Sequence, residues 1–174
     1  MNRIIAVKLL VANILPLILS NYLFSQVDDS RLTVMVFLGI DCPISQDYVV
    51  TLNNIHEQYK GFVKIEGVFP GKCKQRSVSQ FNRDYSLNFS TKTDRKNRIA
   101  KKLKATVTPE VFLFDRSGKV IYRGAIDNWY FELGRHRSSP TEYFLLDAIG
   151  AAIAGEEIKI KETKSIGCFI EKVK

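Results

Sequence analysis

Residues 34–45 read V-M-V-F-L-G-I-D-C-P-I-S, and they combine the signals of a strand, a turn and the start of a helix. Its first part, Val34–Leu38, is an apolar run rich in β-branched and aromatic residues, which is typical of a buried strand. A turn at Cys42 follows, and then Pro43. Proline is tolerated in a first helical turn because the N–H that it lacks would be unpaired there. Cys42 is therefore predicted to lie between a buried strand and the N-terminus of a helix.

That helix is predicted to run over residues 43–60. Its apolar residues are spaced by three or four positions and share one face: Ile44, Tyr48, Leu52, Ile55 and Tyr59. Free N–H groups and the dipole at a helix N-terminus favour an anion, so the Cys42 thiol should ionise readily and act as a nucleophile. The alternative is an inert buried cysteine that packs as a small hydrophobe. The adjacent Asp41 would raise the pKa of the thiol.

The remaining elements follow from periodicity and turn residues. Helical crossovers between the early strands imply parallel pairing, and D-R-S-G at 115–118 predicts a hairpin that adds an antiparallel edge. The prediction is an α/β fold with a central mixed sheet and helices on both faces. The predicted strands cover residues 31–38, 62–69, 88–91 (short), 111–114 and 120–122. The other predicted helices cover 75–85, 94–104 with Asp94 as N-cap, and 139–154 with a capping box at Ser139–Glu142, after a long loop at 125–138.

Four motifs together resemble a known family. They are F-L-G-I-D-C-P-I-S at 37–45, A-T-V-T-P-E-V-F-L-F-D at 105–115, Y-R-G-A-I-D at 122–127 and T-K-S-I-G-C at 163–168. Their order and spacing resemble the thioredoxin-like superfamily. Within it they are similar to extracytoplasmic redoxin-domain proteins related to the alkyl hydroperoxide reductase/thiol-specific antioxidant family. The resemblance spans most of residues 31–170 and implies a thioredoxin-like fold with thiol chemistry at Cys42.

The chain departs from these families at two positions. Ser45 stands where a thioredoxin has its second cysteine, so another thiol must resolve a mixed disulfide formed at Cys42. Gly39 stands where typical peroxiredoxins carry a threonine, three residues before the peroxidatic cysteine. The second departure counts against peroxidase activity.

The resemblance also implies a substrate-binding set of Pro43, Ser45, Thr108 and Pro109. Thr108-Pro109 would be a cis peptide facing Cys42, and the backbone of Thr108 would bind a substrate peptide or mixed disulfide. Without the resemblance, Pro109 would be an ordinary trans proline at the start of a strand. The Ser45 hydroxyl either donates to the Cys42 thiolate or bonds only to the backbone, and both roles remain open.

Two further cysteines could supply a second thiol. Cys168, the preferred partner and second catalytic candidate, lies in the C-terminal tail. Gly167 before it gives the backbone freedom to approach another surface. Cys73 is flanked by two lysines, which would favour its thiolate. A structural disulfide between Cys73 and Cys168 is a further alternative in an oxidising compartment.

Residues 1–25 form a predicted signal peptide. Two basic residues precede the apolar run Leu9–Leu19, and Ser25 offers a small residue for cleavage. The alternative is an uncleaved membrane anchor, although the run is shorter than the roughly 20 residues that span a bilayer. The redoxin domain is assigned to 26–157 and a tail to 158–174. We therefore expect an exported protein, periplasmic or extracellular.

Charge and ligand-type residues restrict the partners. The 174-residue chain carries a net charge of +8, which becomes +6 without the two basic residues of the signal peptide. Its lysines and arginines are spread without interleaved aromatics, so nucleic acid is not expected as a partner. His56 and His136 have no second histidine at ligand spacing, so neither a metal site nor another cofactor is predicted. Arg123 either supports the thiolate or is a solvated charge.

The sequence therefore predicts an exported thiol–disulfide oxidoreductase with Cys42 as nucleophile. The alternatives are a thiol peroxidase with an antioxidant role, and a binding module that keeps the fold without catalysis. Expected partners are protein thiols and disulfides, or a hydroperoxide for the peroxidase, together with a membrane or periplasmic thiol reductant.

Overall fold

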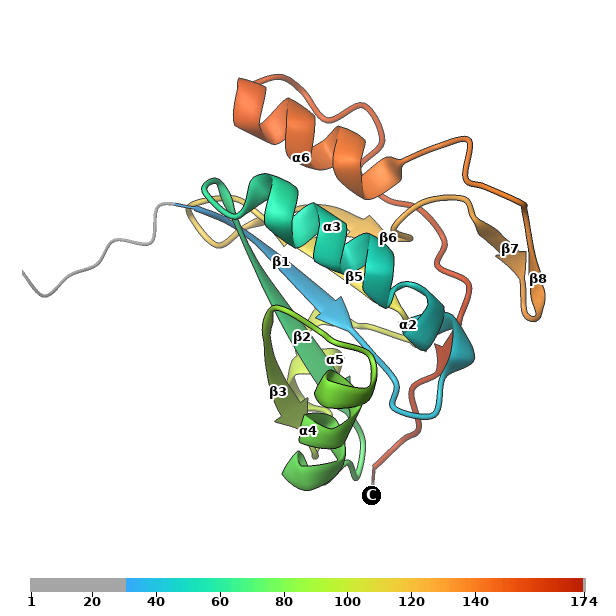
Figure 1. The fold of residues 1–174 in the computed structure, drawn as a ribbon. Coiled ribbons are helices and arrows are strands. Elements are labelled where there is room, and N and C mark those ends of the chain that lie inside the picture. Colours follow the sequence, from blue (N-terminus) through green and yellow to red (C-terminus); the bar gives the residue numbers. More distant parts are fainter. Residues whose placement is uncertain (1–30, 174) are drawn as a thin grey trace, which may run out of the picture. The chain divides into compact units, whose positions relative to one another are not determined.

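The computed structural model describes residues 31–173, so the predicted signal peptide lies outside the described residues. A five-stranded sheet forms its centre, with the strand order β3-β2-β1-β5-β6 (Figure 1). β1 pairs in parallel with β2 and antiparallel with β5, and β5 pairs antiparallel with β6. The predicted mixed sheet with an antiparallel hairpin edge is therefore confirmed. The strands are β1 Leu32–Phe37, β2 Val63–Pro70, β3 Ser90–Asp94, β5 Glu110–Phe114 and β6 Val120–Gly124.

Helices cover both faces of this sheet, as predicted. On one face, Val34 and Val36 of the central strand share a core with α3, α4 and α6. On the other face, Phe37 and Phe112 pack with Ala100 of α5. The alternation follows from the period of two in a strand, which sends neighbouring side chains to opposite faces. The helices are α2 Pro43–Asp47, α3 Val49–Tyr59, α4 Gln75–Asp84, α5 Arg98–Leu103 and α6 Phe144–Ala154. No helix within residues 31–173 is long and apolar enough to cross a membrane.

The prediction of one continuous helix over 43–60 is wrong, because the chain breaks it at Tyr48 into α2 and α3. Tyr48 is buried, and its hydroxyl donates to the buried carboxylate of Asp127, 79 residues further along the chain. The ring also packs edge-on against Trp129, with centroids 5.5 Å apart. A distant carboxylate and an aromatic loop therefore fix the residue at which the two helices meet.

The predicted N-cap at Asp94 is correct in its bonding but not in its position. The Asp94 carboxylate accepts hydrogen bonds from the N–H groups of Arg98, Ile99 and Ala100 at 2.8–2.9 Å. Asp94 itself ends β3, however, and α5 begins four residues later. The carboxylate reaches across the intervening turn to satisfy the free N–H groups of the first helical turn.

The predicted capping box at Ser139–Glu142 does not form, and α6 begins at Phe144. Instead, the side-chain oxygen of Asn128 accepts from the N–H groups of Thr141 and Glu142 at 2.8 and 3.2 Å. The Glu142 N–H, which the capping box would have bound, is thus held by a preceding loop.

The loop predicted at 125–138 contains a small hairpin, formed by β7 Tyr130–Glu132 and β8 Arg135–His136. Its strands are too short for a periodic signal in the sequence. The Trp129 indole N–H donates to the carbonyl of Arg137 at 2.8 Å, which closes the hairpin at its base.

The tail is bound to the domain rather than free (Figure 1, red). Its strand β9, Cys168–Phe169, pairs antiparallel with β4, Val107–Thr108. Further upstream, the Arg123 N–H donates to the Lys161 carbonyl, and the Thr163 N–H donates to the Arg123 carbonyl, both at 3.0 Å. This segment is held mainly by backbone pairing, which does not depend on an apolar face.

Candidate thiol site

Cys42 lies at the end of the turn after β1, where α2 begins, and is 2% exposed. Pro43 occupies the first helical position, as predicted, and is exposed beside it. The thiol of Cys42 donates to the carbonyl of Thr108 at 3.0 Å, 66 residues further along the chain. The nucleophile predicted from the sequence therefore sits against the loop that was predicted to bind substrate.

Ser45 fills the position of the missing second cysteine and is fully buried. Its oxygen accepts a hydrogen bond from the N–H of Gly39 at 3.1 Å. This bond fixes the oxygen as an acceptor, so the hydroxyl hydrogen is left to donate to the sulfur of Cys42. Both the hydroxyl and the backbone N–H of Ser45 lower the pKa of Cys42. The bond from Gly39 is the backbone contact that the sequence left open, and the lowered pKa of Cys42 favours the second role, in which Ser45 also stabilises a thiolate.

Cys168 is brought to Cys42 by the pairing of β9 with β4, which sets Cys168 opposite Thr108. The Thr108 hydroxyl donates to the Cys168 carbonyl at 3.4 Å, and the Ile170 N–H donates to the Thr106 carbonyl at 2.9 Å. The two thiols are close enough for Cys168 to hydrogen-bond the sulfur of Cys42. The tail therefore supplies a second thiol at the site.

The two thiols differ in acidity. Burial raises the pKa of Cys42, but hydrogen bonds from Cys168 and Ser45 outweigh it and leave the pKa below its usual value. Burial and the hydrogen bond and charge of Cys42 raise the pKa of Cys168 to about 11. The pair thus favours a thiolate on Cys42 and a protonated thiol on Cys168. The expected effect of Asp41 on Cys42 is not seen.

The Thr108-Pro109 peptide is cis, as the resemblance implies. Thr108 is 4% exposed, and its pairing edge is taken up by the tail. Gly167 lies so close to it that a Cβ there would be 2.2 Å from the Thr108 carbonyl oxygen. The predicted approach of Gly167 to another surface is therefore a close backbone contact with this loop.

Cys73 lies in the loop before α4 and lines the same concavity as Cys42 and Cys168. Its thiol donates to the Pro70 carbonyl at 3.3 Å. Burial, with a contribution from the charge of Asp41, raises the pKa of Cys73. The expectation that its flanking lysines favour a thiolate is wrong, because burial and the carboxylate dominate. All three cysteines are free thiols.

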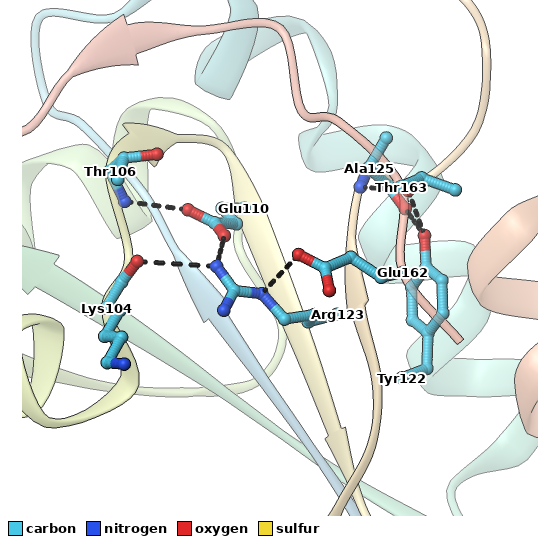
Figure 2. Close-up of polar contacts among 8 residues, drawn as sticks. All are labelled: Lys104, Thr106, Glu110, Tyr122, Arg123, Ala125, Glu162 and Thr163. Atoms are coloured by element: carbon cyan, nitrogen blue, oxygen red, sulfur yellow. Dashed lines mark hydrogen bonds and ion pairs between the residues drawn. The ribbon is translucent and has the colours of Figure 1, made fainter. Parts of the chain in front are cut away.

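A polar cluster behind the site holds the loop that carries Thr108 (Figure 2). The buried carboxylate of Glu110 accepts from the Thr106 N–H at 2.8 Å and from the Arg123 guanidinium at 3.2 Å. Arg123 also donates to the Lys104 carbonyl at 3.4 Å and pairs with Glu162 of the tail at 3.6 Å. Arg123 therefore neither contacts the thiolate nor is a solvated charge. It connects the loop that carries Thr108 to the tail.

The tail is further fixed at Thr163. Its hydroxyl accepts from the Ala125 N–H at 2.9 Å and lies 2.7 Å from the Tyr122 hydroxyl (Figure 2). A Cβ at Gly124 would lie 2.3 Å from the Thr163 carbonyl oxygen, so glycine is required where the tail crosses β6. Glu110 and Thr163 were not predicted as functional residues, although both lie within the quoted motifs.

No group of three or more His, Cys, Asp or Glu side chains in the described part of the chain is arranged to hold a metal ion. Of the residues predicted from the sequence, the site brings together Cys42, Ser45, Thr108, Pro109 and Cys168. Their arrangement suits nucleophilic attack by a thiolate on a sulfur, followed by attack from a neighbouring thiol.

The fold and this pair of thiols define a thioredoxin-like protein. Residues 18–123 match the model of the AhpC/TSA family, so the chain belongs to that family. Family membership supports a thiol redox function of the oxidoreductase type. No curated protein matches the chain in sequence.

Solved structures confirm the thioredoxin-like fold. A hypothetical protein from Sinorhizobium meliloti 1021 is 22% identical, with a TM-score of 0.73 over 84% of this chain and 82% of that one. An uncharacterized conserved protein from Geobacillus kaustophilus is 23% identical, with a TM-score of 0.68 over 87% and 82%. A proposed thiol:disulfide interchange protein, DsbE, from Chlorobium tepidum is 20% identical, with a TM-score of 0.51 over 55% and 68%. At these identities the likeness concerns the fold alone.

Proposed function

We propose that this chain is a thiol–disulfide oxidoreductase in which Cys42 is the nucleophile and Cys168 the resolving thiol. The observation that carries the proposal is the β4–β9 pairing, which sets a thiol of high pKa against one of lowered pKa. The proposal extends the thiol redox function of the family to particular residues and to disulfides of proteins as substrates.

In the first step, the Cys42 thiolate attacks one sulfur of a substrate disulfide. A bond forms between Cys42 and that sulfur, the substrate S–S bond breaks, and the other substrate sulfur leaves as a thiolate that takes up a proton from water. Before substrate arrives, hydrogen bonds from Ser45 and Cys168 stabilise the Cys42 thiolate, so more of it is present at neutral pH; the bond from Ser45 does not depend on the position of the tail.

In the second step, Cys168 attacks Cys42 and releases the substrate's second thiol. The charge that raises the pKa of Cys168 is that of Cys42, and it disappears once Cys42 is bonded to the substrate. Cys168 therefore becomes easier to ionise when it has to attack. The products are a substrate reduced by two electrons and a Cys42–Cys168 disulfide. A membrane or periplasmic thiol reductant would reduce this disulfide back to two thiols.

The proposal is tested by the dithiothreitol-driven reduction of insulin, a model protein disulfide. Cys42→Ser should abolish the acceleration over dithiothreitol alone. In a separate incubation with insulin and without dithiothreitol, Cys168→Ser should accumulate a Cys42–insulin disulfide that mass spectrometry detects. Cys73→Ser is the matched control and should retain the acceleration. Acceleration by the Cys42→Ser variant would contradict the proposal.

A thiol peroxidase is the alternative within the same family. Its mechanism would take Cys42 to a sulfenic acid, which would condense with Cys168. A threonine at position 39 would not fit without movement, because a Cβ at Gly39 would be 2.7 Å from the Thr108 hydroxyl oxygen and 2.8 Å from Cys42 Cβ. A Cys42 sulfenate trapped by dimedone at low hydrogen peroxide would favour the peroxidase.

A binding module without catalysis is the second alternative, and it requires an ordinary Cys42 thiol. The hydrogen bonds that lower the pKa of Cys42 count against it. Export to an oxidising compartment, for which residues 1–25 are the sequence argument, is part of the proposal. It is tested by locating the protein in fractionated cells and sequencing its mature N-terminus.

A further inference from the structure

The tail occupies the strand edge that a substrate would need. Cys168 lies opposite Thr108 in the antiparallel β4–β9 pair, next to a Cys42 that is 2% exposed. Cys168–Phe169 is thus seated as a short strand, preceded by a bend at Gly167, and its cysteine reaches the nucleophile. A substrate cysteine that reached Cys42 in the same way would have to displace this segment.

The fit of residues 166–169 shows what the edge accepts. The position before the cysteine is Gly167, where a Cβ would lie 2.2 Å from the Thr108 carbonyl oxygen and 3.1 Å from the Pro109 nitrogen. These are backbone atoms, which cannot rotate away as a flexible side chain could. The position after the cysteine, Phe169, is 80% exposed and so is little restricted. The edge therefore selects for glycine before the cysteine.

The same segment leads into a strongly basic concavity. Glu171 lines the concavity that holds the three thiols, and Val173 lines the neighbouring one. Apart from Val173, that second concavity is lined only by exposed cations: Lys72, Arg95, Lys96, Arg98 and Lys101.

None of these five cations forms an ion pair within residues 31–173. The nearby carboxylate of Asp94, the residue before Arg95, is buried and already bound by three backbone N–H groups. The tail has a lysine, Lys172, between the lining residues Glu171 and Val173. The charge of the tail is therefore poorly matched to the cations of this concavity. An acidic segment at this place would be attracted, and the attraction would weaken with salt.

We propose that the β4 edge and the basic concavity form one binding site for an extended polypeptide that carries glycine before its cysteine and acidic residues three to five positions after it. The chain's own residues 166–173 fill the site as an internal occupant, which such a partner displaces. This inference rests on the proposed function, since it names the substrate class of the same site.

The redox step at this site transfers two electrons from the Cys42–Cys168 pair to the partner's disulfide. With the tail displaced, the Cys42 thiolate attacks the partner's cysteine, whose former disulfide partner leaves as a thiolate and is protonated by water. The tail then returns, Cys168 attacks Cys42, and the partner leaves as a thiol. The partner is reduced by two electrons and the Cys42–Cys168 pair is oxidised.

The test uses the full chain with Cys168→Ser and Cys73→Ser, so that only Cys42 reacts. Synthetic peptides carry one cysteine activated as a disulfide with thionitrobenzoate, and mass spectrometry identifies the Cys42–peptide disulfide. The reference peptide is Ile-Gly-Cys-Phe-Ile-Glu-Glu-Glu, and the comparison peptides replace either Gly by Ala or the three Glu by Lys. Activated free cysteine measures the intrinsic reactivity of Cys42.

The Ala peptide should react about tenfold more slowly than the reference, because its Cβ meets rigid backbone. The Lys peptide should also react about tenfold more slowly at low ionic strength, and the difference should shrink as salt is added. Adding Gly167→Val should displace the tail and raise the rate with the reference peptide, whereas Lys164→Val, at an exposed tail position, should not.

Equal rates for the reference and Ala peptides would overturn the selection at the β4 edge. Equal rates for the Glu and Lys peptides would overturn the assignment of the basic concavity to an acidic polypeptide. So would an oligodeoxynucleotide that slows the reaction of the reference peptide. Failure of Cys42 to react even with activated free cysteine would instead count against the proposed function. The two failures are therefore distinguishable.

Discussion

Replacing Ser45 by alanine tests how the site makes a nucleophile. The side chain is fully buried, accepts from the Gly39 N–H and donates to Cys42. Ser45→Ala removes the donor, so the pKa of Cys42 should rise. The variant also leaves the Gly39 N–H without its acceptor, which should cost about 1–3 kcal/mol in the free energy of unfolding.

The size of the effect follows from the strength of a hydrogen bond to a charged group, about 1.5–3 kcal/mol. Since about 1.4 kcal/mol corresponds to a tenfold change in an equilibrium constant, the thiolate population should fall about 10- to 150-fold at a pH where both proteins are mostly protonated. The fall disappears at alkaline pH, where Cys42 is ionised in both proteins.

The assay is the rate of Cys42 alkylation by iodoacetamide as a function of pH, resolved for each cysteine by mass spectrometry. Ser77→Ala, at an exposed position lining the same concavity, is the matched control and should leave the profile unchanged. Overlapping profiles for Ser45→Ala and the unaltered protein would refute the argument that Ser45 stabilises the thiolate.

Three further predictions concern the second thiol, the helix break and the polar cluster. Ser45→Cys should restore insulin reduction to the Cys168→Ser variant, because it recreates a cysteine pair at the N-terminus of α2; no recovery would count against the loss of a resolving thiol as the cause of the Cys168→Ser defect. Tyr48→Phe removes a hydrogen bond that lowers the pKa of Asp127, whose pKa burial already raises above 3.8. A carboxyl whose pKa is raised by folding destabilises the folded state as pH rises and it ionises, and Tyr48→Phe makes this effect larger. The decrease in unfolding free energy caused by Tyr48→Phe, measured with denaturant, should therefore be larger at pH 7 than at pH 4. A decrease that does not depend on pH would exclude the mechanism. Arg123→Ala leaves a buried carboxylate without its cation and should cost about 1.5–3 kcal/mol in unfolding free energy, whereas no measurable loss would show that the ion pair is not needed.

The central sheet and the position of Cys42 could be predicted because their signals are local. The apolar run before Cys42 defines β1, and the turn residues at 115–118 define the hairpin between β5 and β6. Each depends on residues within a few positions of one another, so periodicity and turn chemistry suffice.

The features that were missed depend on contacts between distant residues. The break between α2 and α3 is fixed by a bond from Tyr48 to Asp127, across 79 positions. The strand β9 has only two residues, which is too short for any periodic pattern, and its place is set by β4 and by Gly167. The position of Cys168 in the tail, after Gly167, indicated that it could reach Cys42, but the strand pairing that brings it there is a tertiary feature.

Whether Cys42 and Cys168 form the redox pair can be read from a map of the disulfides in the protein. The full chain is purified without reductant from the compartment in which it resides, its free thiols are alkylated, and its disulfides are assigned by mass spectrometry. We expect a Cys42–Cys168 disulfide with Cys73 alkylated. A free Cys42 beside a Cys73–Cys168 disulfide would contradict the claim.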